Sequence, residues 1–235
     1  MAGQSKVAIE AAYKVAANVH LEQIEQFPTV EFFKTIPILA LAQFGKWVDI
    51  LAFPEPAQTL DFSHAIWHYA RGLAFAKTGD LVAARAEQAQ LDANKDSIQI
   101  EFLDGADYPA SVLLGIADDL LLGEIAKTEG KISNAVSYFT NAVASQDALP
   151  YMEPPFWYYP TRQSLGQALL LADEPAEAEA VYRKDLTDYP RNGWSLFGLA
   201  EALGAQDKTD QATAARLKFK QAWSMADVEL DGSRL

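Results

Sequence analysis

The chain has 235 residues, half of them hydrophobic and none of them cysteine, and its 19 Lys and Arg against 32 Asp and Glu give a formal net charge of −13. This charge argues against a nucleic-acid partner, because phosphate binding relies on clustered lysines and arginines. The lack of cysteine excludes disulfides and thiolate chemistry. No apolar run reaches the roughly 18–20 residues of a membrane span, so we expect a soluble protein, cytoplasmic or periplasmic, without membrane insertion.

A short pattern recurs six times along the chain and predicts a turn between two helices. It begins with Gly or Asp, continues with a polar residue, and has a small or apolar residue five positions after the first. Its first residues are Gly3, Gly45, Gly79, Gly130, Asp173 and Asp207. The gaps between them are 42, 34, 51, 43 and 34 residues. A period of 34 residues, lengthened by insertions, is the interval of tetratricopeptide repeats.

The residues that flank these turns follow the same repeat. Seven positions before the turn stands a small residue, which lets one helix approach the next closely. The chain supplies Gly72, Gly123, Gly166 and Ala200 there, with Ile38 as the exception. Nine positions after the turn the repeat has a bulky residue, and the chain supplies Phe139 and Tyr182 but Gln88 and Arg216 in the other two units.

These features identify the family that the chain resembles. The best single match consists of Leu165, Gly166, Leu169, Ala178, Tyr182 and Pro190. On this pattern the chain resembles a bacterial tetratricopeptide-repeat (TPR) protein over almost its whole length. The resemblance implies an all-α fold, a right-handed superhelical solenoid of antiparallel helix pairs with a concave inner face. Each pair has a helix A and a helix B, and stacked neighbours complete the core.

We therefore expect residues 1–235 to form a single solenoid. Its full repeats are predicted at 31–64, 65–98, 116–149, 159–192 and 193–227. Two insertions are expected, one at 94–107 that looks like a linker or lid and one at 149–160. Pro37 is expected to start or kink its helix, because proline cannot donate to the helical ladder. Residues Thr209 to Asp227 are expected to form a long final helix that caps the array.

Residues 1–26 are predicted to form a partial repeat with helix B only, as one helix from Ser5 to about Glu25. Two explanations are open for this beginning. In the first, the chain is the C-terminal part of a longer TPR array. In the second, the apolar stripe of this helix docks onto another copy of the chain, which would give a homo-oligomer.

Two histidines, His64 and His68, stand four positions apart on one face of a predicted helix. This spacing can place two imidazoles on one metal ion, which gives a metal or small-ligand module as one hypothesis. A third ligand is lacking, however, and the alternative is that His68 and Arg71 bond to neighbouring carboxylates or carbonyls. The sequence has no nucleophile elbow, phosphate loop or metalloprotease motif, so we expect neither catalysis nor a cofactor.

The insertion Tyr151–Tyr159 holds five aromatic residues and two prolines. Rigid aromatic side chains of this kind are enriched at binding hot spots. The alternative is that Phe156 and Trp157 fill a widened gap between two repeats. Both hold if Trp157 points inward and Tyr151 or Tyr158 points outward.

The resemblance also places residues on the concave face, because helix A positions two, five, nine and twelve face it in peptide-binding TPR proteins. From these positions and the insertion we expect partner contacts by Tyr69, Glu124, Lys127, Gln163, Gln167, Trp194, Phe197, Glu201, Tyr151, Trp157 and Tyr158. The Lys/Asn/Arg set that clamps a peptide carboxylate in chaperone-adaptor TPRs is absent. We therefore predict a non-catalytic scaffold for a protein or peptide with apolar anchors, and the net charge favours a basic one. Self-association is the alternative.

Overall fold

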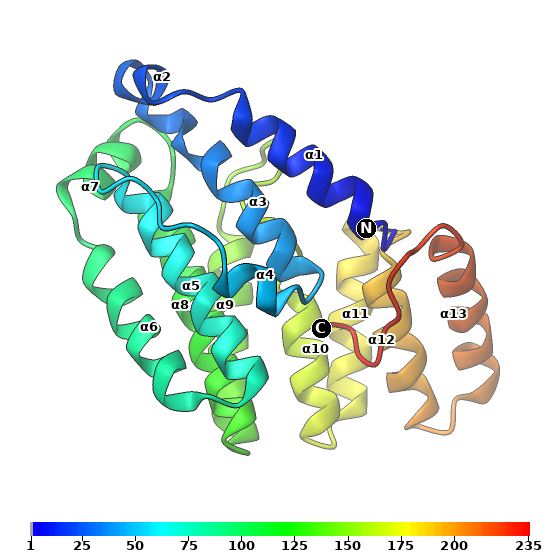
Figure 1. Cartoon of the computed structure of the whole chain (residues 1–235). Helices are drawn as coiled ribbons and strands as arrows, with labels where there is room; N and C mark the ends of the chain where they lie inside the picture. The colour runs from blue at the N-terminus through cyan, green and yellow to red at the C-terminus, as the bar shows by residue number, and fades with distance from the viewer. Residues whose placement is uncertain (1) are drawn as a thin grey trace.

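The structure is a computed structural model that describes residues 2–235, and within this range the chain is helical without a β-strand (Figure 1). The first helices are α1 (Ser5–Ala17), α2 (Leu21–Gln26), a 3-10 helix η1 (Pro28–Glu31), α3 (Phe32–Gln43) and α4 (Trp47–Leu51). The middle of the chain holds α5 (Asp61–Thr78), α6 (Leu81–Asn94), α7 (Ile98–Gly105), α8 (Ala110–Thr128) and α9 (Ile132–Asp147). The last four are α10 (Arg162–Leu171), α11 (Pro175–Asp188), α12 (Gly193–Gly204) and α13 (Thr209–Ala222).

All six predicted turn positions are confirmed by the backbone. The first residue of each recurring pattern has a positive φ, between 57° and 88°. Left-handed backbone of this kind costs energy for most residues, and glycine and aspartate tolerate it best. At the five positions after Gly3 the pattern marks the place where one helix ends and the next begins, and Gly3 lies just before α1.

Helices joined by these turns pack against each other. Contacts join α3 to α4, α5 to α6, α8 to α9, α10 to α11 and α12 to α13, and further contacts join α5 to α3 and to α8. Small residues make two of the contacts close: a Cβ at Gly123 would lie 2.4 Å from the Phe139 ring, and one at Gly166 would lie 2.3 Å from the Tyr182 ring. The small and bulky positions of the sequence pattern thus meet in space.

Two predicted helix ends were wrong, those of the first and the last helix, and two further expectations are made more specific. The first helix ends at Ala17 and α2 follows separately, because His20 caps α2: its N–H donates to the Gln23 side chain at 2.8 Å. The segment 94–107 is not a loop but contains α7, whose N-terminus is capped by Ser97. The last helix ends at Ala222 rather than Asp227. Pro37 lies inside α3, five residues after its start, so it does not begin that helix.

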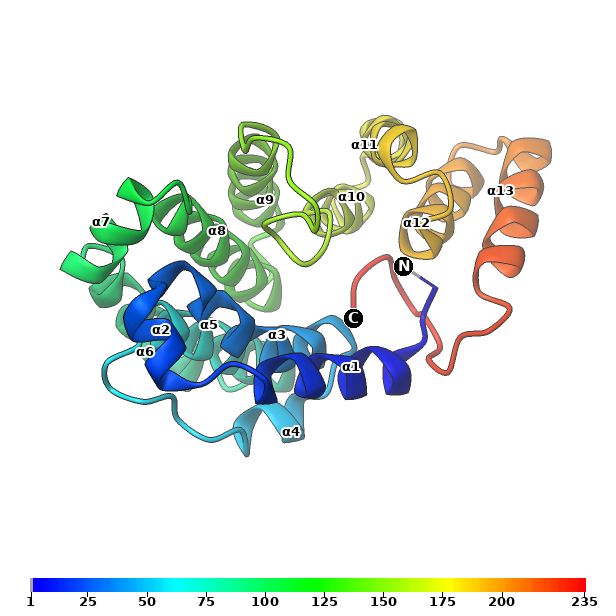
Figure 2. The same cartoon turned by 90° about the horizontal axis from the view of Figure 1, so that it is seen from above.

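The predicted insertion at 149–160 remains outside the helices, between α9 and α10. A second non-helical stretch follows α13, and we call residues 223–235 the inner segment. Seen from above, the helices form an arc, and the inner segment runs from α13 back along the inner side of this arc, with α1 and α3 on one side and α10 and α12 on the other (Figure 2). We call this inner side of the arc the hollow. The hollow of the arc is therefore occupied by the chain itself.

Candidate functional site

The inner segment connects the last helix to the first. The Asp227 carboxylate accepts hydrogen bonds from the backbone N–H groups of Ser5, at 2.6 Å, and Lys6, at 3.0 Å. In return the Asp227 N–H donates to the Gly3 carbonyl at 2.9 Å. Free N–H groups at a helix N-terminus need acceptors and favour negative charge. Asp227 therefore caps α1 from the far end of the chain.

Ser233 fixes the next part of the inner segment against α10 and α11. Its side chain is buried, and its hydroxyl donates to the main-chain carbonyl of Gln163 at 2.9 Å. The Tyr182 hydroxyl lies 2.5 Å from the Ser233 oxygen and can donate to it. The Tyr182 ring is itself held between Gly166 and Gly198, where a Cβ would lie within 2.3 Å of it. Gly166 and Tyr182, two positions of the best-matching repeat, thus orient the hydroxyl that contacts Ser233.

Arg234 is buried, with 4% of its surface exposed, and its guanidinium lies at the C-terminal end of α3. Nη1 donates to the Gln43 carbonyl at 3.0 Å, and Nη2 donates to the Ala42 carbonyl at 3.2 Å. Carbonyls in the last turn of a helix lack intrahelical donors and carry partial negative charge, so a cation is favoured there.

Two tyrosines of the 149–160 insertion complete the surroundings of this guanidinium. Nη2 also donates to the Tyr158 hydroxyl at 3.2 Å, and Cζ lies 4.2 Å from the centroid of the Tyr159 ring. A cation over an aromatic face is attracted by the negative charge of the π system. The main-chain carbonyl of Arg234 accepts from Gln167 Nε2 at 3.1 Å. All hydrogen-bond acceptors of this guanidinium among residues 2–235 are neutral oxygens.

A buried charged cluster lies beside Gln167. Glu124, which is 3% exposed, accepts ion pairs from Lys77 Nζ at 3.0 Å and Lys127 Nζ at 2.8 Å. Burial opposes ionisation of Glu124, but the two ammonium groups outweigh it and hold the pKa of this carboxyl at about 2. Burial lowers the pKa of Lys77 to about 8. Lys127 Nζ also lies 3.4 Å from Gln167 Oε1, which links the cluster to the inner segment.

The structure brings several predicted site residues together, although Tyr69, Glu124 and Gln163 among them are buried. Gln163, Gln167, Glu124, Lys127 and Tyr158 lie around residues 233–234 or next to their contacts. Tyr69 is fully buried, because its hydroxyl lies 3.1 Å from that of Tyr158 and its ring packs against Trp157. Tyr69 is therefore not accessible to a partner, and it holds the Tyr158 side chain in place.

The aromatic insertion has side chains that point inward and others that point outward, and Tyr151 rather than Tyr158 is the outward tyrosine. Trp157 is 4% exposed and points inward, while Tyr151 is 87% exposed. Tyr158, which was a candidate for the outward side, turns inward to Tyr69 and Arg234. The insertion therefore fills the gap between helices and also supplies the tyrosines that hold the guanidinium.

The predicted residues on α12 lie at the other end of the hollow. Trp194 is 1% exposed because Trp223 of the inner segment packs edge-on against it, with ring centroids 5.2 Å apart. Phe197 is half-buried against Phe219 of α13, and Glu201 is exposed with Arg216 3.3 Å away. The aromatic positions of α12 thus contact the chain's own C-terminal residues.

His64 and His68 do not converge on a common centre. Their ring centroids lie 6.5 Å apart, and no group of three or more His, Cys, Asp or Glu within residues 2–235 is arranged to hold a metal ion. His68 Nδ1 instead lies 2.6 Å from Glu87 Oε2, and Arg71 Nε donates to the other oxygen of Glu87 at 2.7 Å. The carboxylate-bonding interpretation of His68 and Arg71 is confirmed.

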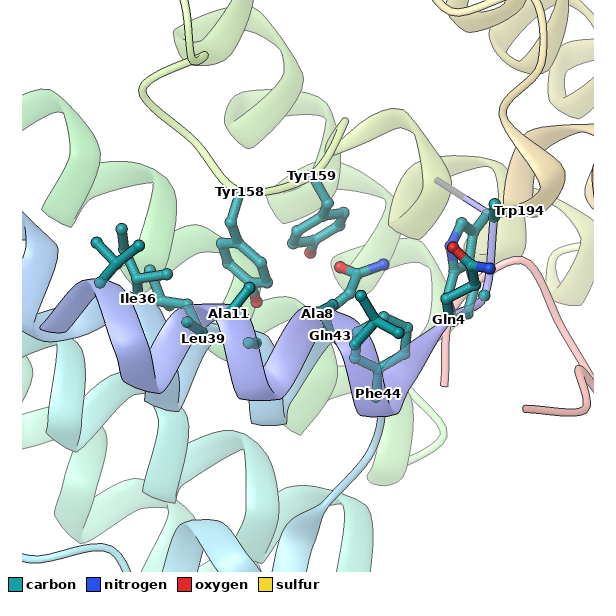
Figure 3. A pocket seen from close by; sticks show the side chains of 16 residues that line it. Gln4, Ala8, Ala11, Ile36, Leu39, Gln43, Phe44, Tyr158, Tyr159 and Trp194 are labelled. Atoms are coloured by element: carbon teal, nitrogen blue, oxygen red, sulfur yellow. The ribbon is translucent and has the colours of Figure 1, made fainter. Parts of the chain in front are cut away.

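A cavity of about 540 Å³ adjoins the guanidinium site. Figure 3 shows it between Ala8 and Ala11 of α1, Leu39 of α3, and the Tyr158 and Tyr159 side chains above them. Its lining is largely apolar, and its size is typical of small-ligand or side-chain pockets. Gln43, Tyr158 and Tyr159 line this cavity and also contact Arg234.

Sequence reasoning did not anticipate the inner segment, since the predicted repeats stop at residue 227 and nothing was assigned beyond it. Among residues 2–235 no helix is long and apolar enough to cross a membrane. No protein-family model, curated protein sequence or solved structure matches the chain. The function must therefore be inferred from the geometry of the hollow and its occupant.

Proposed function

We propose that the chain is a TPR-like, non-catalytic scaffold whose concave groove binds a non-helical segment of a protein partner. The fold part of the proposal rests on the 34-residue spacing and the left-handed turns at all six predicted positions. It also rests on the close approach of Gly123 and Gly166 to the bulky residues Phe139 and Tyr182. These are the contacts by which helix pairs of such a solenoid would pack.

One observation carries the functional part: a non-helical stretch of the chain, with turns and bends, already lies in the hollow. It is held there through main-chain and side-chain contacts by Gln163, Gln167 and Tyr158, which are predicted groove residues. A preformed groove with hydrogen-bonding groups at fixed positions avoids much of the ordering cost of binding. A groove that accommodates residues 223–235 has the shape and chemistry to accommodate a similar segment of a partner.

Charge adds a constraint on the partner. The net charge of −13 steers a basic protein toward the chain as a whole. The floor of the groove, however, holds Lys77 and Lys127 around Glu124. We therefore expect a partner that is basic overall and whose bound segment is of mixed charge.

Site-specific photo-crosslinking in the cells of origin tests this function. A photoreactive phenylalanine would replace Phe197 or Tyr151 on the predicted binding side, and Val82 of α6 as a matched outer position, since Val82 is 84% exposed. We expect a defined crosslinked product from Phe197 or Tyr151 and none from Val82. Crosslinks from Val82 alone, or from all three positions equally, would contradict groove binding.

Self-association through α1 is a second candidate, favoured by the exposure of two valines on this helix. Val7 is 64% and Val15 is 39% exposed. The N-terminus of α1, by contrast, is already capped by Asp227 of the same chain. Sedimentation at several protein concentrations decides the matter: a mass that rises with concentration supports self-association, and a constant monomer mass excludes it.

A further inference from the structure

The contacts of the inner segment also point to what the groove recognises. We propose that the C-terminal end of α3, together with Tyr158 and Tyr159, is a recognition site for the arginine of a partner's non-helical segment, and that Arg234 occupies this site as an internal competitor. The inference rests on the proposed groove-binding function and adds the chemistry of the ligand to it.

The geometry selects a guanidinium over an ammonium group. Two separate nitrogens of Arg234 reach two successive carbonyls, those of Ala42 and Gln43, while the plane of the group lies against an aromatic ring. A guanidinium is planar and presents several donors in a fixed fork, and it is also more weakly hydrated than an ammonium group. The single nitrogen of a lysine would have to reach both carbonyls by itself, and it has no planar group to place over Tyr159. The site therefore discriminates by shape as well as by charge.

The residues next to Arg234 show which neighbours the ligand needs. A Cβ at Gly232 would lie 2.2 Å from Gln167 Nε2, so a larger residue two positions before the arginine would push this amide away from the Arg234 carbonyl to which it donates. The residue directly before it is a serine whose hydroxyl donates to the Gln163 carbonyl and lies beside the Tyr182 hydroxyl. Glu229 and Asp231, by contrast, are exposed. The matching ligand is a non-helical segment of the form small–Ser–Arg, bent before its arginine as residues 231–233 are.

The neighbouring cavity indicates that the inner segment is not the best occupant. About 540 Å³ of mostly apolar space adjoins the tyrosines that hold Arg234 (Figure 3), and none of the residues that line it belongs to the inner segment. Burying an apolar side chain there would add stabilisation in proportion to the area removed from water. A partner segment that carries a bulky apolar residue near its arginine would therefore compete well against residues 232–235.

The test uses the full chain and two synthetic peptides. The first peptide has the sequence of residues 229–235, and the second replaces its arginine by citrulline, which keeps the planar shape but loses the charge and replaces one NH2 group, with its two donors, by a carbonyl oxygen. Binding to wild type and to Arg234→Ala is measured by fluorescence anisotropy. We expect Arg234→Ala to bind the arginine peptide at least tenfold more tightly than wild type does, and at least tenfold more tightly than it binds the citrulline peptide.

Tyr158→Phe and Tyr151→Phe, each combined with Arg234→Ala, provide the matched pair. The Tyr158 hydroxyl oxygen accepts a hydrogen bond from Arg234 Nη2, whereas Tyr151 is exposed and its hydroxyl donates to Glu153. Tyr158→Phe should lower the affinity for the arginine peptide severalfold, and Tyr151→Phe should leave this affinity unchanged. Equal affinities for the arginine and citrulline peptides, or no saturable binding to Arg234→Ala, would overturn the proposal.

A measurement on the wild-type chain covers the case in which Arg234→Ala does not fold. In a chain with ¹⁵N-labelled arginine, the Nε–H signal of buried Arg234 should move to the position of free arginine as the arginine peptide is added in excess. An unmoved signal would overturn the proposal. The two proposals can fail separately. If groove positions crosslink to a partner in cells but the arginine and citrulline peptides bind equally well, the arginine site is rejected and the scaffold function is retained.

Discussion

The carboxylate of Asp227 accepts a hydrogen bond from the backbone N–H of Ser5, at 2.6 Å, although the two residues are 222 positions apart. This bond joins the first helix of the chain to the segment that follows the last. Hydrogen bonds from the backbone of Lys6 and Ser5 lower the pKa of Asp227 to about 2. The contact that closes the arc is therefore an ionic helix cap supplied from a distance.

Replacing Asp227 by Asn should loosen α1 without unfolding the rest of the chain. An amide is a weaker acceptor than a carboxylate and carries no charge for the helix terminus. We expect faster hydrogen exchange in residues 5–12 and in the inner segment, with little change in α8 and α9. Asp231→Asn is the control, because Asp231 is exposed and forms none of these bonds. Equal exchange in both variants would show that Asp227 does not hold α1.

The same bond predicts an acid dependence. A carboxyl with a lowered pKa stabilises the folded arrangement above its ordinary value near 4, and this contribution is lost as the pH falls through about 2. Protection of residues 5–12 should therefore persist at pH 5. In wild type this protection should be lost as the pH falls through about 2. In Asp227→Asn it should already be weaker at pH 5.

Gly198 tests the contact that holds Tyr182. A Cβ at Gly198 would lie 2.2 Å from Tyr182 Cζ, and this ring is fully buried with little room to move. Gly198→Ala should therefore destabilise the chain by roughly 1–3 kcal/mol, the usual cost of overpacking a core. Gly115→Ala is the matched control, because Gly115 lies in α8 with open space at its Cβ position.

In that control, alanine should be neutral or stabilising by up to about 1 kcal/mol, because glycine is the poorer helix former. Urea denaturation followed by circular dichroism measures both changes. If Gly198→Ala proved as stable as Gly115→Ala, the close packing around Tyr182 would be disproved.

Asp185 predicts a second pH dependence, of opposite sign. It lies at the end of α11 and is 1% exposed, and burial raises its pKa to about 6 even though Ser195 and Asn192 donate to it. Between its ordinary pKa near 4 and about 6, the folded chain binds more protons than the unfolded chain. Stability should therefore fall as the pH rises through this window, by roughly 2–3 kcal/mol from this group.

Asp185→Asn should remove this part of the slope and raise stability at pH 7, because the amide oxygen still accepts from Ser195 while the buried charge is gone. Asp188→Asn, which changes an exposed carboxylate on the same helix, should leave the slope unchanged. Denaturation midpoints measured from pH 4 to pH 7 decide between these outcomes. A slope that survives in Asp185→Asn would contradict the assignment.

The local parts of this fold could be predicted from the sequence, and the long-range parts could not. Turns at Gly79 and Asp173 were identified because a left-handed backbone restricts the residue type at that position. The helix α7 was missed because residues 94–107 were interpreted as a linker or lid, whereas Ser97 caps a helix that runs from Ile98 to Gly105. Tertiary contacts decide the outcome where local signals are weak.

The candidate site shows the same division. The repeat register placed Gln163 and Gln167 on the concave side, and both contact the inner segment. Nothing in the sequence revealed that Arg234 lies there, because its partners are carbonyls of Ala42 and Gln43, some 190 residues earlier. A main-chain acceptor has no residue signature, so such a contact leaves no pattern in the sequence.

If the inner segment occupies an exchangeable ligand site, a competing peptide must change its distance from the helices, and this distance can be measured. The chain has no native cysteine, so two spin labels can be attached selectively at Asp231 and Val82, both of which are exposed. The free chain should give one narrow distance distribution. Peptide 229–235, at concentrations that saturate Arg234→Ala, should produce a second, broader distribution in the wild-type background. A distribution that stays narrow and unchanged under those conditions would contradict the account.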